Sequence, residues 1–516
     1  MAEPGRARGL LLLGSVFAVA AAGLVYELIA GTLTTYLLGS SVLVFSIVIG
    51  LFLSAMGLGA WLAQYVRFEL ARAFVIAELV LGLVGGLSAL GLFAAFAWSD
   101  SYRACLLLVS VVIGALVGLE IPLLLRILEK RVEVRVVVSH VLALDYFGAL
   151  VGSVAFPLLL LPHLGLVRSA ALLGLMNVAV AFLALAVLGT EIARRGRLVA
   201  FGSAVAALLL GVLIGGGRAT TWLEDQLYSD PVMLARSTPY QRVVVTRWRD
   251  DLRLYLDGHL QFSSADEYRY HEALIHPAMA AAEVPAQVLI LGGGDGLAVR
   301  EVLRWAAVRR VVLVDLDPAV TELFTEHGAL ADLNGGALKD PRVQVVHGDA
   351  VRFLQDSPDR FDVIVMDLPD PNDAQLARLY SLPTFRLARS RLRPGGALVT
   401  QATSPFYALE AFWCIATTMT AAFAEERPGG AQAQVMAYHA HVPSFGEWGW
   451  VLARSPGADL TLPEAVARDL RFLDDEALQG MFRFPTDLQP PEGVRVNRLT
   501  DAILARYYTR GWRRWN

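Results

Sequence analysis

Seven long apolar stretches constrain this chain more than any other feature. They lie roughly at 10–30, 41–64, 73–98, 104–127, 140–161, 167–188 and 198–217. Each is close to the ~20 residues that a helix needs to cross a bilayer. The whole chain is 55% hydrophobic and only 18% charged, too apolar for an ordinary soluble protein of 516 residues. We therefore predict a helical membrane domain over residues 1–217, with about seven spans in a lipid bilayer.

The charges between these stretches conflict with the predicted number of crossings. Arg and Lys concentrate before the first stretch and in the second, fourth and sixth connections, for example at Arg67, Arg126 and Arg195. The positive-inside rule places such segments in the cytoplasm, so seven crossings would deliver the C-terminus to the other side. Two alternatives stay open: one stretch does not cross fully, or the C-terminal part lies outside the cytoplasm.

A second domain is predicted over residues 218–516, where charged residues and prolines return. Residues 225–285 are predicted to form a small β region, because 241–248 and 252–256 alternate at period two around a hairpin turn at Arg249-Asp250-Asp251. Residues 286–455 alternate short apolar strands with helix-length segments, which is typical of a Rossmann-like, methyltransferase-type α/β core. Residues 456–516 are expected to form a helical tail. The formal net charge of −4 argues against a nucleic-acid partner.

Five aspartates follow predicted strands of this core, and the first stands in a glycine-rich loop, Gly292-Gly293-Gly294-Asp295-Gly296. The others are Asp315, Asp349, Asp367 and Asp370. Ligands of doubly wound sheets bind at the carboxyl ends of the strands, and glycines let the backbone approach a ligand closely. Asp315 is placed to accept from ribose hydroxyls and Asp349 from an adenine amino group. The structural alternative is that either residue only caps the next helix.

Asp295 narrows the class of nucleoside. The carboxylate of S-adenosylmethionine would be repelled by an anionic side chain in the glycine loop, whereas a donor that ends in a bare ammonium would be attracted. Decarboxylated S-adenosylmethionine is such a donor. The pair Asp367 and Asp370 predicts a second cationic substrate, because a carboxylate can bind an ammonium ion and then accept its proton.

At this point the sequence resembles the polyamine aminopropyltransferase (spermidine synthase) family, and with its helical N-terminal half it resembles the membrane-bound, multi-pass branch. The resemblance covers about residues 225–455. It is carried by the order of Pro239-Tyr240-Gln241, Leu256-Asp257-Gly258, Tyr270-His271-Glu272, the glycine loop, Asp315-Leu316-Asp317, Gly348-Asp349-Ala350 and Asp367-Leu368-Pro369-Asp370-Pro371. The family implies transfer of an aminopropyl group from decarboxylated S-adenosylmethionine to putrescine, which gives spermidine and methylthioadenosine.

The resemblance also implies a role for each matching position. Asp367 would act as the base, with Tyr270 beside it. The amine substrate would be contacted by Asp370, Glu272 and Gln401. The donor would be held by Gln241, His271, Gly292, Gly294, Asp295, Gly296, Asp315, Asp349 and Ala350.

No metal or cofactor is expected, since the donor is a co-substrate and no clustered His/Cys ligand set is present. The family further implies a possible homodimer in the cell membrane, with the catalytic domain in the cytoplasm where the donor is made.

Three departures from the family pattern leave the acceptor amine, and turnover itself, open. Leu368 and Pro369 replace two serines of the usual catalytic loop, and Phe445 stands where a second tyrosine is expected. Two alternatives therefore remain. One is a methyltransferase that uses S-adenosylmethionine, and the other is a membrane polyamine sensor or transporter with a catalytically degenerate synthase domain.

Four acids lie within or near the apolar stretches, at Glu27, Glu78, Glu120 and Asp145. Intramembrane carboxylates are expensive and often functional. Our hypothesis is a cation site formed chiefly by Glu27, Glu120 and Asp145. The alternative is that these side chains lie near span ends or pair with polar neighbours, and that the helices only anchor the enzyme.

Overall fold

The structure is a computed structural model, which describes residues 4–38, 42–67, 69–98, 101–129, 134–188, 192–226, 228–424, 435–455 and 469–515. The chain divides into two compact units, Met1–Thr246 and Arg247–Asn516. The two units are described separately below. The predicted domain boundary after residue 217 marks the end of the apolar stretches and stays a prediction.

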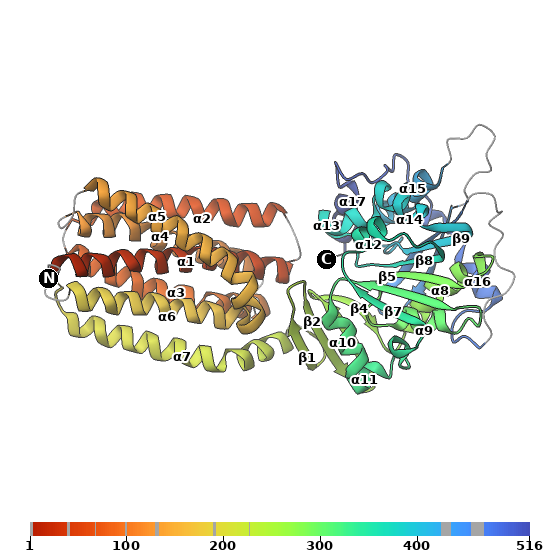
Figure 1. Ribbon diagram of the computed structural model, residues 1–516, viewed down its shortest axis with the longest axis horizontal. Coiled ribbons are helices and arrows are strands. Elements are labelled where there is room, and N and C mark those ends of the chain that lie inside the picture. Colours follow the sequence, from red (N-terminus) through yellow and green to blue (C-terminus); the bar gives the residue numbers. More distant parts are fainter. Residues whose placement is uncertain are drawn as a thin grey trace. The chain divides into compact units, whose positions relative to one another are not determined.

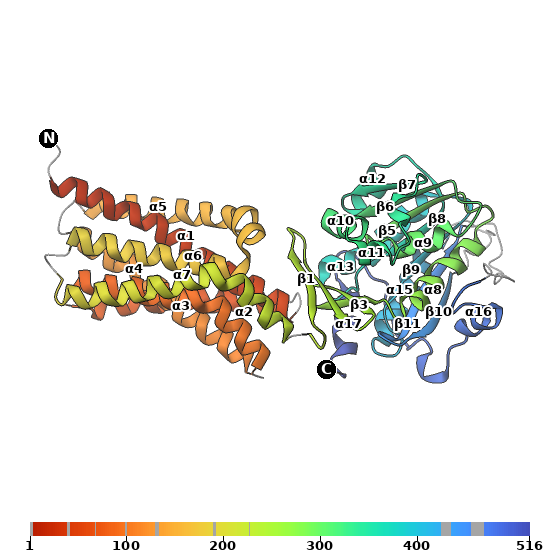
Figure 2. The same ribbon diagram turned by 90° about the horizontal axis from the view of Figure 1, so that it is seen from below.

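The first unit is a bundle of long helices that lie side by side (Figures 1 and 2). Its α-helices are α1 (Pro4–Leu38), α2 (Val42–Leu62), α3 (Leu70–Trp98), α4 (Tyr102–Leu128), α5 (Val134–Ala155), α6 (Leu161–Leu188) and α7 (Arg195–Asp225), and two short turns are η1 (Ala63–Tyr65) and η2 (Phe156–Leu160). Among the described residues, six helices are long and apolar enough to cross a membrane.

The fifth of these six helices differs from a single span. It runs over Val137–Leu188, which is 52 residues, and at 1.5 Å per residue a continuous helix would measure roughly 78 Å, against ~30 Å of bilayer hydrocarbon. The helix is broken at Gly165, where φ is 71° and ψ is −179°. Figure 1 shows α5 and α6 as separate arms on the two sides of this break. The expectation of about seven crossings stays a prediction.

Small residues let helices of the bundle approach each other closely. A Cβ atom placed on Gly118 of α4 would lie 2.0 Å from the carbonyl oxygen of Met56 on α2. One placed on Gly59 of α2 would lie 2.0 Å from the carbonyl oxygen of Ala115. The backbones of α2 and α4 therefore meet directly, as is common between helices in membranes, where small residues allow close van der Waals packing.

A small antiparallel sheet follows the bundle in the chain. Its strands β1 (Val232–Ser237), β2 (Arg242–Trp248), β3 (Asp251–Leu256) and β4 (His259–Ser263) are hydrogen-bonded in the order β1-β2-β3-β4. The predicted hairpin is confirmed, with its turn between β2 and β3 at Arg249, whose φ is 57°. The region predicted as β at 225–285 also contains a helix, α8 (Glu267–Ala281).

The second unit is built on a seven-stranded sheet with the order β10-β11-β9-β8-β5-β6-β7. The strands are β5 (Gln287–Gly292), β6 (Arg310–Asp315), β7 (Val343–His347), β8 (Phe361–Asp367), β9 (Leu392–Gln401), β10 (Val435–Val442) and β11 (Gly446–Arg454). The five strands predicted at the sequence level are parallel neighbours. Strands β10 and β11 extend this sheet in antiparallel fashion.

The central strands are apolar on both faces because helices cover both. Val288, Leu289, Ile290 and Leu291 of β5 are all 0% exposed, which is the continuous apolar run expected of a buried parallel strand. Figure 1 shows α8 and α9 (Leu297–Leu303) on one side of the sheet and α12 (Ala350–Asp356), α14 (Leu382–Ser390) and α15 (Leu409–Phe423) on the other.

The remaining helical segments lie at the ends of strands or after the sheet. They are α10 (Pro318–Glu326), α11 (Gly328–Ala331), η4 (Ala337–Lys339), α13 (Ala374–Ala377), η5 (Arg378–Tyr380), α16 (Asp475–Met481), η6 (Thr486–Leu488) and α17 (Ile503–Trp512). Part of the predicted helical tail, residues 456–468, lies outside the described residues.

The strand order reverses between β5 and β8, which fixes where a ligand can bind. After β5 the chain adds β6 and β7 on one side, whereas β8 and β9 lie on the other. In open α/β sheets the loops at the carboxyl ends diverge at such a switch point and leave a crevice. The register of the two strands places Gly292 opposite Asp367, so the glycine loop and the predicted base flank this point.

Candidate functional site

The glycine loop leaves β5 in a conformation that disfavours side chains. Gly292, Gly293 and Gly296 have φ values of 81°, 68° and 77°, in the region where only glycine is unstrained. A Cβ atom on Gly292 would lie 1.9 Å from the carbonyl oxygen of Asp367, and one on Gly294 would lie 2.6 Å from a carboxylate oxygen of Asp315. The glycine loop therefore packs in close contact with Asp367 and Asp315, two of the five predicted acids.

Asp367 and Tyr270 meet at the end of β8. The Tyr270 hydroxyl donates to Asp367 Oδ1 at 2.7 Å, from a position on α8 that is 97 residues away in the chain. Burial raises the pKa of Asp367, while the positive charge of His271 and the bond from Tyr270 lower it. Burial and the charge of Asp367 raise the pKa of Tyr270, so the tyrosine is a fixed hydrogen-bond donor.

Next to this pair, three charged side chains of alternating sign, His271, Glu267 and Arg300, contact one another. His271 Nδ1 lies 2.8 Å from Glu267 Oε2, and Arg300 donates to both carboxylate oxygens of Glu267 at 3.0 Å. Burial opposes a charge on His271, but the bond to Glu267 and its negative charge outweigh burial and raise the pKa of His271 to about 9. The imidazole is therefore a cation at neutral pH, and its charge acts on Asp295 and Asp367.

Asp295 is buried in the glycine loop, with 9% of its surface exposed. Its Oδ1 accepts from the backbone N–H of Leu297 at 2.9 Å, and its backbone carbonyl accepts from Asn334 Nδ2 at 2.8 Å. Burial raises the pKa of Asp295 to about 6, against the charge of His271, which lowers it. The side chain is thus anionic near neutral pH and is fixed at the start of α9.

The two predicted nucleoside contacts differ in their surroundings. Asp315 accepts from the backbone N–H groups of Gly294 and Asp317, both at 2.9 Å, and it is Asp317 that caps α10. Asp349 does cap α12, by accepting from the N–H of Arg352 at 2.9 Å, and it also forms an ion pair with Arg378. The helix cap of the structural alternative is therefore present at Asp349, and Ala350 is the first residue of the capped helix. The predicted contacts of Asp349 and Ala350 with the donor stay predictions.

Asp370 is surrounded by three hydrogen-bond donors. Its Oδ2 accepts from the Tyr508 hydroxyl at 2.9 Å and from Thr403 Oγ1 at 3.4 Å, and its Oδ1 accepts from Gln401 Nε2 at 3.3 Å. Burial raises the pKa of Asp370 to about 6, while the bonds from Tyr508, Gln401 and Thr403 lower it. Thr403 has a φ of 61°, a strained conformation for a β-branched residue, and such strain tends to occur at functional sites.

Gln401 and Tyr380 hold the backbone between the two acids. Gln401 Nε2 donates to the Leu368 carbonyl at 2.8 Å and to the Tyr380 hydroxyl at 2.6 Å, and its Oε1 accepts from the N–H of Thr403 at 2.9 Å. The Tyr380 hydroxyl lies 2.9 Å from the carbonyl oxygens of Leu368 and Pro369. These contacts fix the loop without the two serines of the family pattern. Gln401 positions the loop and Asp370.

One predicted site residue of the second unit, Glu272, is held by other contacts. The carboxylate of Glu272 accepts from the backbone N–H groups of Arg471, Phe472 and Leu473 at 2.9, 2.8 and 3.0 Å, which supports a structural role in place of a substrate contact. Gln241 immediately precedes β2 and belongs to the first unit, and its predicted contact with the donor stays a prediction.

Three tyrosines surround the loop from Asp367 to Asp370, and two of them were missed at the sequence level. Tyr380 is 12 residues from Leu368, and Tyr508 on α17 is 138 residues from Asp370. Phe445 packs against Tyr270 with ring centroids 6.0 Å apart, so it adds an apolar wall and no hydroxyl. No local pattern around Tyr508 marks it, because its role depends on where the last helix packs.

The described residues of the site provide acids and aromatic rings that are not arranged as a metal site. In the part of the chain that the structure describes, no group of three or more His, Cys, Asp or Glu residues is arranged to hold a metal ion. The arrangement instead provides two half-buried carboxylates on one loop, a third, buried carboxylate in the glycine loop, and a cationic imidazole whose charge acts on Asp295 and Asp367.

Comparison with known proteins gives a consistent result. Residues 267–460 match the family described as spermine/spermidine synthase domain. The chain is 46% identical over 517 residues to a protein of Ralstonia nicotianae named polyamine aminopropyltransferase 1, covering 99% of this chain and 97% of that protein. A second Ralstonia nicotianae protein, polyamine aminopropyltransferase 2, is 47% identical and covers 97% and 98%. The polyamine aminopropyltransferase of Leptospira interrogans is 42% identical over 503 residues, covering 97% and 98%.

Proposed function

The chain belongs to the polyamine aminopropyltransferase family, and on this premise we propose that it transfers an aminopropyl group from decarboxylated S-adenosylmethionine to putrescine. The products are spermidine and methylthioadenosine. The observation that carries the proposal is the pair of half-buried acids, Asp367 and Asp370, on one hydrogen-bonded loop beside the glycine loop.

The donor half of the proposal rests on the glycine loop and the acids around it. Gly292 and Gly294 let the backbone run close to Asp367 and Asp315, and Asp315 holds the loop through the N–H of Gly294. Asp295 is anionic near neutral pH and buried, so it attracts an ammonium group and repels a carboxylate. A donor whose amino-acid tail has lost its carboxylate fits this charge.

The acceptor half rests on Asp367 and Asp370. An amine is protonated at neutral pH and must lose a proton before its nitrogen can attack. Asp367 binds the incoming ammonium and takes that proton, and the nitrogen then attacks the carbon attached to the sulfonium sulfur. The carbon–sulfur bond breaks, and its electron pair leaves the sulfur as a neutral thioether. Tyr270 orients Asp367, and Asp370 attracts the positive charge of the substrate's far amino group.

The departures from the family pattern are compensated in this structure. Leu368 and Pro369 present backbone carbonyls to Tyr380 and Gln401, so the loop is fixed without serine hydroxyls. Tyr508 supplies a hydroxyl to Asp370, although Phe445 supplies none to the site. These contacts support turnover over a degenerate sensor or transporter.

The proposal is tested with the purified full-length protein in detergent. It is incubated with decarboxylated S-adenosylmethionine and each of a panel of di- and triamines, and methylthioadenosine and the new polyamine are measured. Putrescine is expected to give the highest kcat/KM, and formation of methylthioadenosine with none of the amines would contradict the proposal.

The Asp367→Asn variant distinguishes the role of Asp367 as a base from a role in donor binding. The amide cannot accept the proton, so kcat is expected to fall by about 10²–10⁴-fold, while calorimetry shows donor affinity within a few-fold of the unmodified protein. Asp373→Asn is the matched control, because Asp373 only caps α13 in the following loop through the N–H of Leu376. Equal losses in both variants would refute the role of Asp367.

We further propose that the protein is a multi-pass membrane protein whose catalytic unit faces the cytoplasm. The six long apolar helices of the described residues support membrane insertion. The use of a donor made in the cytoplasm supports a cytoplasmic catalytic unit, although seven crossings from a cytoplasmic N-terminus would place that unit outside. A reporter fused after Asn516 would give a cytoplasmic signal, and an external signal would refute this placement. A homodimer, which the family implies, is checked by light scattering of the purified protein.

A further inference from the structure

Three acidic side chains from three different helices come together inside the helical bundle. They are Glu78 on α3, Glu120 on α4 and Asp145 on α5, and the first two are 0% and 1% exposed. In the described part of the chain, none of the three forms an ion pair with Lys, Arg or His. Any negative charge on these three groups is therefore not balanced by a basic side chain of the described residues.

The polar atoms of this cluster are largely without partners. Both carboxylate oxygens of Glu120, Oε1 of Glu78 and the hydroxyl of Tyr26 are buried without a hydrogen bond among the described residues. Among the described residues, the donor recorded to the two glutamates is Asn177 Nδ2, which lies 3.2 Å from Glu78 Oε2. Glu78 and Glu120 are neighbours, but two carboxylates only accept hydrogen bonds. When both are ionised, a donor from outside the pair is needed to satisfy them, and a cationic donor also balances their charge.

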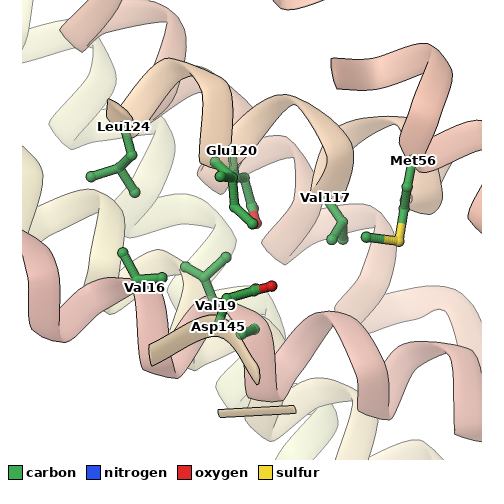
Figure 3. A pocket seen from close by; sticks show the side chains of 9 residues that line it. Val16, Val19, Met56, Val117, Glu120, Leu124 and Asp145 are labelled. Atoms are coloured by element: carbon green, nitrogen blue, oxygen red, sulfur yellow. The ribbon is translucent and has the colours of Figure 1, made fainter. Parts of the chain in front are cut away.

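A small cavity lies where Glu120 and Asp145 face each other. Figure 3 shows both carboxyl groups directed into the same space. The cavity has a volume of about 20 Å³, which is enough for one group of the size of water or ammonium. Apart from the two acids its walls are apolar, formed by Val16, Val19, Ala20, Met56, Val117, Ile121 and Leu124.

We propose that this cavity binds the protonated amino group of an alkylamine, so that the helical unit contains an amine site of its own. An alkylammonium group offers three N–H donors and one positive charge, which matches the unpartnered acceptors of Glu120 and its neighbours. The valine, leucine and methionine side chains of the wall suit the methylene chain of the amine. An anionic or a purely apolar ligand would leave the carboxylates unbalanced in a low-dielectric environment, where uncompensated charge is strongly unfavourable.

The composition of the site differs from the sequence-based hypothesis. Glu120 and Asp145 do line the cavity, as expected, but Glu27 is not among its lining residues. Glu78, Tyr26 and Asn177 take its place behind Glu120. The proposal is independent of the transfer reaction, since none of these residues belongs to the second unit.

Binding is tested on the full-length protein in lipid nanodiscs with radiolabelled putrescine as the probe. Excess potassium chloride is present, so that only a preference for an amine over an alkali cation is registered. The double variant Asp367→Asn, Asp370→Asn removes the acids of the transfer site, and about one putrescine per chain is expected to remain bound. Adding Glu120→Gln to this variant is expected to weaken the remaining binding at least tenfold.

Two further variants separate charge from folding. Glu129→Gln changes the same residue type at the exposed end of the same helix and is expected to leave binding unchanged. Val19→Leu fills the cavity and keeps every acid, so it is expected to weaken binding even if Glu120→Gln does not fold. The proposal is overturned if the Asp367→Asn, Asp370→Asn variant binds no putrescine, which would mean that the carboxyl groups hold only protons. It is also overturned if neither Glu120→Gln nor Val19→Leu changes the affinity.

Discussion

Tyr508→Phe isolates the contribution of the last helix to the transfer site. The substitution removes one hydroxyl and keeps the ring that packs beside Trp512. The lost hydrogen bond runs from the Tyr508 hydroxyl to Asp370 Oδ2 at 2.9 Å. A hydrogen bond to a charged acceptor contributes about 1.5–3 kcal/mol. Since about 1.4 kcal/mol corresponds to a factor of ten, the kcat/KM for the amine is expected to fall by roughly 10- to 100-fold.

The Tyr508→Phe substitution should lower kcat/KM for the amine and should not affect binding of the nucleoside donor. Asp370 attracts the cationic substrate only while it is ionised, and burial has already raised its pKa to about 6. The bond from Tyr508 lowers that pKa, so its removal raises the pKa further. Amine binding, which is present above the pKa of Asp370 and lost as the pH falls through it, should therefore fail at a higher pH in the variant. The KM for the donor should stay unchanged.

The assay is the pH profile of kcat/KM for putrescine, measured at saturating donor for both proteins. Tyr507→Phe is the matched control, because Tyr507 is the adjacent residue of α17 and its hydroxyl forms no hydrogen bond with the residues that the structure describes. A folded Tyr508→Phe protein with kcat/KM within about threefold of the parent, and with an unshifted acid limb, would refute the assigned role of Tyr508.

Three further predictions concern the remaining buried acids. Asp295→Asn should reduce the preference for decarboxylated over carboxylated S-adenosylmethionine at least tenfold in calorimetry, and an unchanged preference would contradict the charge argument. Glu272→Gln should lower the free energy of unfolding by about 1–3 kcal/mol, because three backbone N–H groups lose a charged acceptor; unaltered denaturant midpoints would speak against this. Burial raises the pKa of Glu301, but the hydrogen bond from His276 and the charge of Arg300 outweigh burial and lower this pKa from 4.5 to about 2. The ionised Glu301 therefore stabilises the fold above pH 4.5, and this contribution is lost as the pH falls toward 2. Glu301→Gln should flatten that part of the stability profile, which thermal unfolding measures.

The local elements of both units were predictable because their signals are short-range. The length and hydropathy of the apolar stretches predict helices of membrane-spanning size. Among the described residues, six such helices are found when Val137–Leu188 is counted as one, and the predicted seven are found when it is divided at the Gly165 break. The hairpin at Arg249 and the five parallel strands follow from period-two and apolar patterns. The glycine loop is predictable because four glycines stand within five residues after a strand, and three of them have the positive φ values that favour glycine.

The acids at strand ends were predictable as a group, since parallel strands bring their carboxyl ends to one edge. Their individual partners were not. Asp349 caps a helix and pairs with Arg378, and Glu272 turns away to hold residues 471–473. Each of these outcomes depends on which distant segment packs nearby.

The sequence by itself determined the two-part organisation, the glycine loop at the head of a parallel sheet, and the acids that follow its strands, because composition, periodicity and backbone conformation are local properties. Only the tertiary structure decided that Tyr270, Tyr380 and Tyr508 surround the loop from Asp367 to Asp370. It also decided that Glu78 joins Glu120 beside a cavity between four helices, α1, α2, α4 and α5. The hydrogen bonds of these tyrosines join residues 12 to 138 positions apart, and burial at those contacts, rather than residue type alone, sets the charge and hydrogen bonding of each side chain.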